Sequence, residues 1–185
     1  MKITVDCSRS AGPLPHFWRS TGFAPASLLL RDDMRQSLSF IGGIPHHGIL
    51  HVRIHDLLDL VSAGRLSSAK PWYNFSRLDD GLDALVSNGL KPFFELMGRP
   101  SREFTTFHDL DQVRAWRDLV RALAEHLMKR YGREEVESWY FETWNEPDTG
   151  WWKEDEQAFC NYFDACRVGL SEANPALRLG GPGTC

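Results

Sequence analysis

The sequence has few cysteines, no long apolar run and no excess of positive charge. Only 4 of its 185 residues are cysteine, and their spacing matches no zinc or redox template, so we interpret Cys160 and Cys166 as packed free thiols. No apolar stretch reaches the roughly 18 residues that a membrane span requires. A net charge of -4 without a dense Lys/Arg run argues against nucleic-acid binding. We therefore expect neither a membrane nor a nucleic acid as partner.

The start of the chain, MKITVDCSRS, also lacks the apolar run that precedes a signal-peptide cleavage site. Without a signal peptide the default location is the cytoplasm, whereas a processed form would fit a lysosomal or secreted protein.

Strand-like and helix-like segments alternate along most of the chain. Strands are expected over residues 17–24, 48–56, 90–97, 137–144 and 177–179, and helices over residues 32–41, 74–86, 110–130 and 154–173. Since parallel neighbours need helical crossovers, this order predicts an α/β fold with a parallel sheet. No G-x-G-x-x-G turn follows the first strand, which disfavours a dinucleotide-binding sheet.

Polar residues gather where the predicted strands end: Arg53, His55 and Asp56, then Glu95, then Asn145 and Glu146. The active sites of (β/α)8 barrels lie at this end of the strands. A whole barrel needs about 250 residues, so we expect the amino-terminal half of a TIM barrel, strands 1 to 5. Two unpaired barrel edges would then favour self-association.

A separate short strand is expected before the barrel, because Lys2–Cys7 alternates in hydropathy. We predict that residues 1–15 are a leading strand and linker of an accessory β-sandwich. Residues 16–185 are then the partial catalytic barrel.

The strongest local motif is the aromatic strand that ends in Asn145-Glu146-Pro147. Glycosidic bond cleavage needs a carboxylic acid that protonates the leaving oxygen. A buried strand end beside Trp144 would raise the pKa of the Glu146 carboxyl into a range useful for proton donation. Asn145 could bind a sugar hydroxyl, and Trp144, Trp151 and Trp152 could stack on sugar rings. The alternative is a simple strand exit, since Asn and Pro favour turns.

Alternation along the second strand puts Arg53 and His55 on the same face, towards the barrel centre. There Arg53 could orient a carboxylate and His55 could bind a hydroxyl. The alternative for Arg53 is a buried ion pair with Glu95 or Glu142. Glu95 and Glu142 could each act as the nucleophile, but both are better interpreted as structural partners.

A metal site is not expected. His46 and His47 follow Pro45 in a loop, and no third ligand stands at a suitable spacing.

Several long segments together resemble glycoside hydrolase family 39, and within it the α-L-iduronidase branch more than the β-xylosidases. The resemblance covers nearly the whole chain and is carried by HFWRSTGF (16–23), PHHGILHVRIH (45–55), YNFSRLDDGLDALVSNGLKPFFELMG (73–98), FETWNEPD (141–148), NYFDACRVGL (161–170) and PALRLGGPG (175–183).

The resemblance implies a retaining hydrolase that acts on terminal α-L-iduronic acid residues of glycosaminoglycan-like glycans. It implies that Glu146 is the acid/base, that Asn145 and His55 contact the sugar, and that Arg53 orients the nucleophile. The family nucleophile, a glutamate on the seventh strand, matches no position here, so the 185 residues alone are expected to be inactive. No metal or organic cofactor is implied. The open alternatives are a β-xylosidase and a carbohydrate-binding fragment without catalysis.

Overall fold

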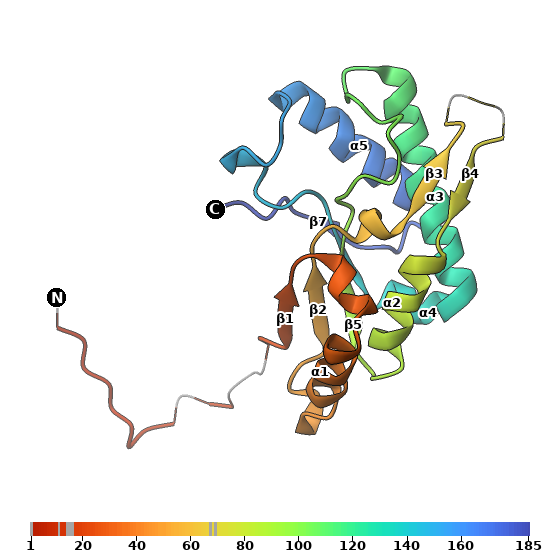
Figure 1. Cartoon of the computed structure of the whole chain (residues 1–185). Coiled ribbons are helices and arrows are strands. Elements are labelled where there is room, and N and C mark those ends of the chain that lie inside the picture. The colour runs from red at the N-terminus through yellow and green to blue at the C-terminus, as the bar shows by residue number, and fades with distance from the viewer. Residues whose placement is uncertain (1, 11, 14–16, 67, 69) are drawn as a thin grey trace.

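A parallel sheet of five strands forms the centre of the molecule, in the order β1-β2-β5-β6-β7 (Figure 1). The computed structural model describes residues 2–10, 12–13, 17–66, 68 and 70–185. The strands of the sheet are β1 (Ser20–Phe23), β2 (His51–Ile54), β5 (Lys91–Glu95), β6 (Tyr140–Glu142) and β7 (Leu179–Gly180). Each overlaps a segment that the sequence predicts as strand.

Helices connect each strand of this sheet to the next. They are α1 (Asp32–Gly42), α2 (Ser76–Val86), α3 (Leu110–Tyr131), α4 (Arg133–Glu137) and α5 (Glu156–Ala173). Short 3₁₀ helices lie in the connections: η1 (Ala26–Leu30), η2 (Pro45–His47), η3 (Leu57–Leu60) and η4 (Pro147–Thr149). None of the helices in the described part of the chain is long and apolar enough to span a membrane.

The strand order separates a barrel from a doubly wound sheet. The five strands are neighbours in the order in which the chain visits them, with no reversal of the kind that creates a dinucleotide-binding crevice. Burial also alternates along β2, where Val52 and Ile54 are fully buried and Arg53 is half-buried. One face of the sheet is therefore covered by the hydrophobic core and the other carries the polar side chains, as in the wall of a barrel.

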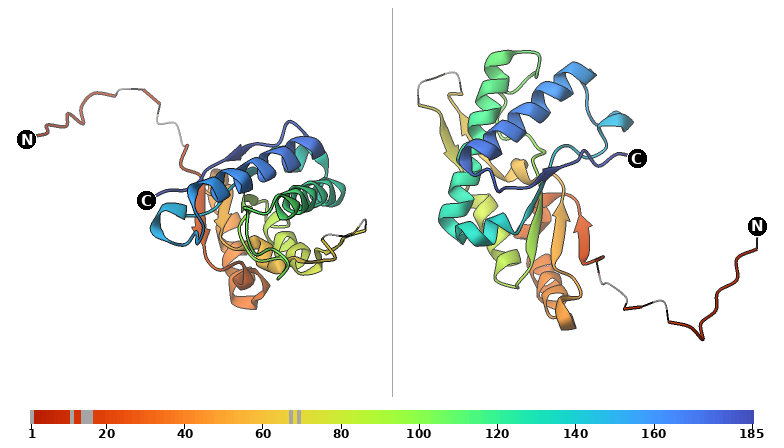
Figure 2. Two further views of the ribbon diagram at one scale, coloured as in Figure 1. Left: turned by 90° about the horizontal axis from the view of Figure 1, so that it is seen from above. Right: turned by 180° about the vertical axis from the view of Figure 1, so that it is seen from behind.

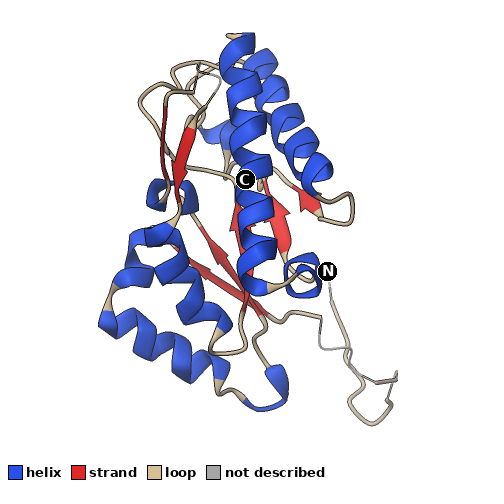
Figure 3. Ribbon diagram, turned by 90° about the vertical axis from the view of Figure 1, so that its right-hand side faces the viewer, coloured by secondary structure: helices blue, strands red, loops and turns tan. Residues whose placement is uncertain are grey.

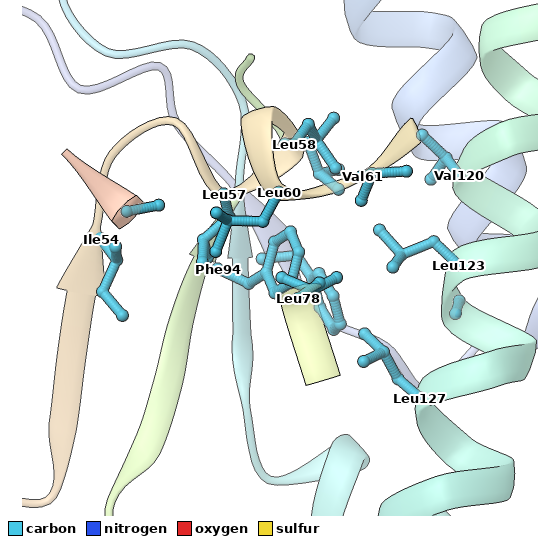
Figure 4. Packing of buried hydrophobic residues seen from close by; sticks show 14 of the residues in the cluster. Ile54, Leu57, Leu58, Leu60, Val61, Leu78, Phe94, Val120, Leu123 and Leu127 are labelled. Atoms are coloured by element: carbon cyan, nitrogen blue, oxygen red, sulfur yellow. The ribbon is translucent and has the colours of Figure 1, made fainter. Parts of the chain in front are cut away.

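The core fills the space between the sheet and α3 (Figure 4). Leu119, Leu123 and Leu127 recur at helical spacing on α3, and all three are fully buried. The side chain of Asp109 accepts a hydrogen bond from the Asp111 amide and caps the start of this helix, and Gly132, at φ 92°, ends it. Burial of each such leucine stabilises the fold by about 1.5–3 kcal/mol.

Helices α3 and α5 pack side by side, as both views of Figure 2 and the view of Figure 3 show. A Cβ atom at Gly169 would lie 2.5 Å from the Arg117 carbonyl oxygen and 3.0 Å from the Val120 side chain. The absence of a side chain at Gly169 thus allows the two backbones to approach.

Two elements differ from the predicted order. An antiparallel hairpin, β3 (Ser62–Gly64) and β4 (Trp72–Asn74), lies apart from the main sheet (Figures 1 and 3). The predicted strand over residues 137–144 is shorter than expected, because Glu137 ends α4.

The predicted leading strand over Lys2–Cys7 is not formed. These residues are exposed and have no regular structure, and they run away from the rest of the molecule (Figure 1). A strand needs a hydrogen-bonding neighbour, and no described segment lies alongside this one. The boundary predicted between residues 15 and 16 falls outside the described residues, so the assignment of residues 1–15 to an accessory sheet stays a prediction.

Candidate active site

The carboxyl ends of β2, β5 and β6 bring the predicted polar residues together. Parallel pairing sets Arg53 opposite Phe93 and Glu95 opposite Glu142. Because these strands are adjacent, side chains that lie about 40 and 90 positions apart in the sequence meet on one face of the sheet.

Arg53 lies at the centre of this group and contacts two glutamates. Its Nε donates to Glu142 Oε2 at 2.6 Å and its Nη2 to Glu142 Oε1 at 3.1 Å, which makes the pair bidentate. Its Nη2 also lies 2.6 Å from Glu95 Oε1, although this oxygen receives no well-aligned hydrogen bond. The structural partners that the sequence suggests for Arg53 are therefore both present, Glu142 as a bidentate ion pair and Glu95 as a close contact.

One guanidinium cannot neutralise two carboxylates, and Glu95 is the more deeply buried of the two. Its side chain is fully buried, and burial raises the pKa of Glu95 to about 8, against the smaller opposing effect of Arg53. Glu95 is accordingly the partner that holds a proton at neutral pH.

This proton sets the state of His55, whose Nδ1 lies 2.6 Å from Glu95 Oε2. Burial lowers the pKa of His55, and the charge of Arg53 lowers it further. A neutral imidazole beside a protonated carboxyl accepts the hydrogen bond at Nδ1 and carries its own hydrogen on Nε2. His55 can thus donate to a hydroxyl group in the cleft that it lines.

Asn145 is held by the same arginine. Arg53 Nη2 donates to Asn145 Oδ1 at 3.0 Å, so the amide nitrogen remains able to donate to a ligand. Asn145 also forms a parallel bridge with Gly183. A Cβ atom at Gly183 would lie 2.7 Å from Arg53 Nη2 and 2.9 Å from Glu142 Oε1, so a glycine is needed beside this pair.

Glu146 follows with an uncommon backbone conformation. Its φ of 46° and ψ of 52° are left-handed, a region that costs a non-glycine residue about 1–3 kcal/mol and that often occurs at functional sites. A 2.6 Å hydrogen bond from the Glu146 amide to the Gly183 carbonyl oxygen stabilises it. The side chain is half-buried and interacts electrostatically with Arg53 and His55.

A cleft of about 470 Å³ joins these residues. Its wall includes His55, Asn145 and Glu146, together with Trp144 and Trp151. Of the tryptophans that the sequence suggests as stacking surfaces, Trp151 is 67% exposed. Trp152 packs against other aromatic rings, and its ring centroid lies 5.2 Å from that of Trp144 and 5.3 Å from that of Tyr162.

The cleft also contains residues that the sequence motifs did not single out. Asp59 and Arg99 line it, and Asp59 Oδ1 accepts a hydrogen bond from the Arg99 amide at 2.7 Å. The sequence feature that could have pointed to them is Gly98, which follows the third predicted strand. Its φ is 138°, and it packs against the backbone of Asp59. Such a glycine marks a close approach of two loops at the strand ends.

The remaining candidates lie outside the cleft. His46 and His47 are exposed in η2, and no group of three His, Cys, Asp or Glu side chains in the described ranges is placed to hold a metal ion. Cys166 is fully buried and accepts from the Trp116 indole at 3.3 Å, whereas Cys160 is exposed, so only the first is packed as predicted.

Known proteins are similar to this chain over most of its length. The chain is 48% identical to mouse α-L-iduronidase over 191 residues, which cover 98% of the chain and 30% of that protein. It is 30% identical to the β-xylosidase of Caldicellulosiruptor saccharolyticus, of which it covers 40%. A bacterial orthologue of human α-L-iduronidase superposes with a TM-score of 0.87 at 50% identity, over 93% of this chain and 28% of that one.

The likeness extends to the fold and to the family as a whole. A β-xylosidase structure from Caulobacter crescentus superposes with a TM-score of 0.75 at 32% identity, over 96% of this chain and 38% of that one. The chain thus spans about a third of the length of these relatives, and its five parallel strands correspond to the amino-terminal part of their TIM barrel, as predicted. The model for glycosyl hydrolases family 39 matches residues 1–185, and the chain therefore belongs to that family.

Proposed function

We propose that these residues form the acid/base half of the active site of a retaining α-L-iduronidase-type hydrolase. The observation that carries the proposal is the cleft in which Glu146 lies beside Asn145 and His55 at the carboxyl end of the sheet. Glu146 donates its proton to the leaving glycosidic oxygen and then, as a carboxylate, removes a proton from the attacking water.

The neighbouring residues hold and orient the sugar. The free amide nitrogen of Asn145 and the Nε2 hydrogen of His55 are both donors, suited to sugar hydroxyl oxygens. Arg53 keeps both groups in place, directly through Asn145 and through Glu95 for His55. Nη1 of Arg53 takes part in none of these contacts and is the nitrogen that orients the nucleophile.

Retention requires a second carboxyl group about 5–5.5 Å from the first. By the family resemblance this nucleophile is a glutamate on the seventh strand, which corresponds to none of the 185 residues. We therefore expect that the 185-residue chain alone hydrolyses no glycoside, and that the protein at its full natural length does.

The preference for an iduronide over a xyloside rests on similarity. Identity is 48% to the mouse α-L-iduronidase and 30% to the Caldicellulosiruptor β-xylosidase over comparable parts of the chain. Parallel assays of the full-length protein with an aryl α-L-iduronide and an aryl β-D-xyloside test this. Faster turnover of the xyloside would assign the site to the second activity instead.

The role of Glu146 is tested with the same assays. Glu146→Gln should lower kcat for an unactivated iduronide by about 10²–10⁴-fold, because the amide cannot protonate the leaving oxygen. Glu125→Gln on the exposed face of α3 is the matched control and should leave the rate unchanged. Binding of the sugar by calorimetry without any turnover by the full-length wild-type protein would favour a carbohydrate-binding module.

A further inference from the structure

We propose that a second groove, next to the Glu146 cleft, binds the acidic glycan chain that leaves during hydrolysis. This inference rests on the proposed hydrolase function and extends it to the part of the substrate that is not the terminal sugar. The groove has a volume of about 660 Å³ and is formed by the loops that follow β5 and β6.

The groove adjoins the cleft. Gly98, Arg99, Trp144 and Trp151 line both spaces, so a ligand can extend from one into the other. A terminal sugar alone fills one site, and a longer chain has room in the neighbouring one.

The position of the acid decides which part of the substrate lies there. Glu146 has to contact the oxygen of the leaving group to protonate it, so the leaving chain lies on the side of the cleft where Glu146 stands. Trp144 and Trp151 flank Glu146 in the sequence and form the passage to the groove. The groove is thus on the path of the leaving chain.

The charge of the groove indicates the chemistry of that chain. Its charged lining residues are Arg99, Arg102, Lys153 and Glu154, in a protein whose overall net charge is -4. The carboxylate of Glu154 is already occupied, because it accepts hydrogen bonds from the Thr106 hydroxyl and from the Phe107 amide at 3.0 Å.

The three cations are by contrast available. Within the described residues, neither the Arg99 nor the Arg102 guanidinium forms an ion pair, and the Lys153 ammonium donates only to the Gly150 carbonyl oxygen. All three residues are exposed. Guanidinium groups in this state bind carboxylate and sulfate oxygens in a bidentate manner.

An aromatic surface accompanies these charges. Trp151 is 67% exposed, and Phe104 is half-buried on the groove wall. Large flat rings offer an apolar face beside polar groups, which suits the C–H face of a sugar ring. Cations and an exposed indole together favour a carboxylated or sulfated oligosaccharide over a neutral one.

The test compares a short and a long substrate in the full-length protein. Arg102→Ala/Lys153→Ala is assayed with an aryl α-L-iduronide and with an iduronate-terminated glycosaminoglycan tetrasaccharide, sulfated or desulfated. The double substitution should lower kcat/KM for the tetrasaccharide about five- to tenfold more than for the aryl glycoside at low salt, mainly through KM. The difference should shrink as salt is added, because the contacts are exposed.

Arg77→Ala/Lys129→Ala removes the same charge at exposed positions on α2 and α3 and is the control. Lys129 lies about 20 Å along α3 from Trp116, which lines the groove. The control double variant should therefore leave kcat/KM unchanged for both substrates. If Arg102→Ala/Lys153→Ala also lowers kcat/KM for the desulfated tetrasaccharide, the groove binds carboxylates. If kcat/KM falls only for the sulfated tetrasaccharide, the groove binds sulfates.

Equal effects of Arg102→Ala/Lys153→Ala on both substrates, or an equal effect of the control pair on the tetrasaccharide, would overturn the proposal. If the wild-type protein does not cleave the aryl iduronide, the hydrolase function fails instead. Calorimetric titration of the tetrasaccharide into the same variants then still decides whether the groove binds it.

Discussion

One arginine contacts the residues around it, and burial sets their protonation. Arg53 holds Glu142 by two hydrogen bonds and lies close to the buried Glu95. Burial nevertheless raises the pKa of Glu95 to about 8, more than the charge of Arg53 lowers it, and the protonated carboxyl then faces Nδ1 of His55. A buried, protonated carboxyl of this kind costs less than a buried charge and still positions its partner.

The raised pKa of Glu95 has a consequence for stability against pH. A carboxyl whose pKa rises from 4.5 to about 8 on folding stabilises the folded state fully below pH 4.5, and this contribution is lost as the pH rises towards 8. Glu95→Gln removes this dependence. Between pH 5 and 8 the free energy of unfolding of the wild type should fall relative to that of the variant, by up to about 1.4 kcal/mol per pH unit.

Urea unfolding of the full-length protein at pH 5, 6, 7 and 8 measures this, with Glu125→Gln as the exposed control. Parallel pH profiles for wild type and Glu95→Gln would mean that Glu95 is ionised throughout and that His55 is held by a charge.

At this scale the sequence predicted which side chains meet, but not their protonation. Alternation along a strand puts Arg53 and His55 on one face, and strand ends in a parallel sheet converge. Which of Glu95 and Glu142 takes the proton depends on burial by distant residues, which no local pattern contains.

At the scale of elements, the contact between α3 and α5 depends on one glycine. A methyl group at Gly169 would meet the backbone carbonyl of Arg117, which cannot turn away as a side chain can. Gly169→Ala should therefore destabilise the protein by about 1–2 kcal/mol, since overpacking costs about 1–3 kcal/mol and the better helix propensity of alanine returns at most about 1.

Thermal or urea unfolding checks this, with Ser171→Ala on the exposed side of the same helix as control. Ser171→Ala should stay within about 0.5 kcal/mol of wild type. A Gly169→Ala variant at least as stable as wild type would show that the helices separate freely.

The helices and main strands could be predicted from the spacing of apolar residues, because the side chains that they bury recur at the same spacing. Leucines at helical spacing predicted α2 and α3, and apolar runs predicted the strands. The β3–β4 hairpin was missed because its strands are three residues each and pair across a loop without a strong turn motif. Residues 2–7 alternate in hydropathy but form no strand here, since a strand needs a neighbour that can pair with it, and their place in an accessory sheet stays a prediction.

At the scale of the whole molecule, the sheet ends in two open edges. In the described part of the chain, β1 and β7 each pair with one neighbour only. Aromatic side chains are also accessible there: Tyr140 of β6 is 36% exposed, and Phe17, which precedes β1 and lines a hollow together with Tyr140, is 82% exposed. Open strand edges and exposed rings both favour contacts between copies.

The 185-residue chain prepared by itself should therefore self-associate. Light scattering after size-exclusion chromatography should give a mass that rises with concentration, and Tyr140→Lys should reduce this rise by adding charge to the accessible face. A monodisperse monomer at every concentration would contradict the expectation and would mean that the edges are covered by the chain itself.

The role of Glu146 as the acid/base is tested most directly by chemical rescue. In the full-length protein, Glu146→Ala is supplied with an aryl α-L-iduronide whose phenol leaves without protonation, and with azide, a nucleophile that needs no general base. If Glu146 is the acid/base, azide restores turnover and yields an α-configured iduronyl azide, because two inversions retain configuration. Wild-type turnover by Glu146→Ala without azide, or a β-configured azide product, would contradict it.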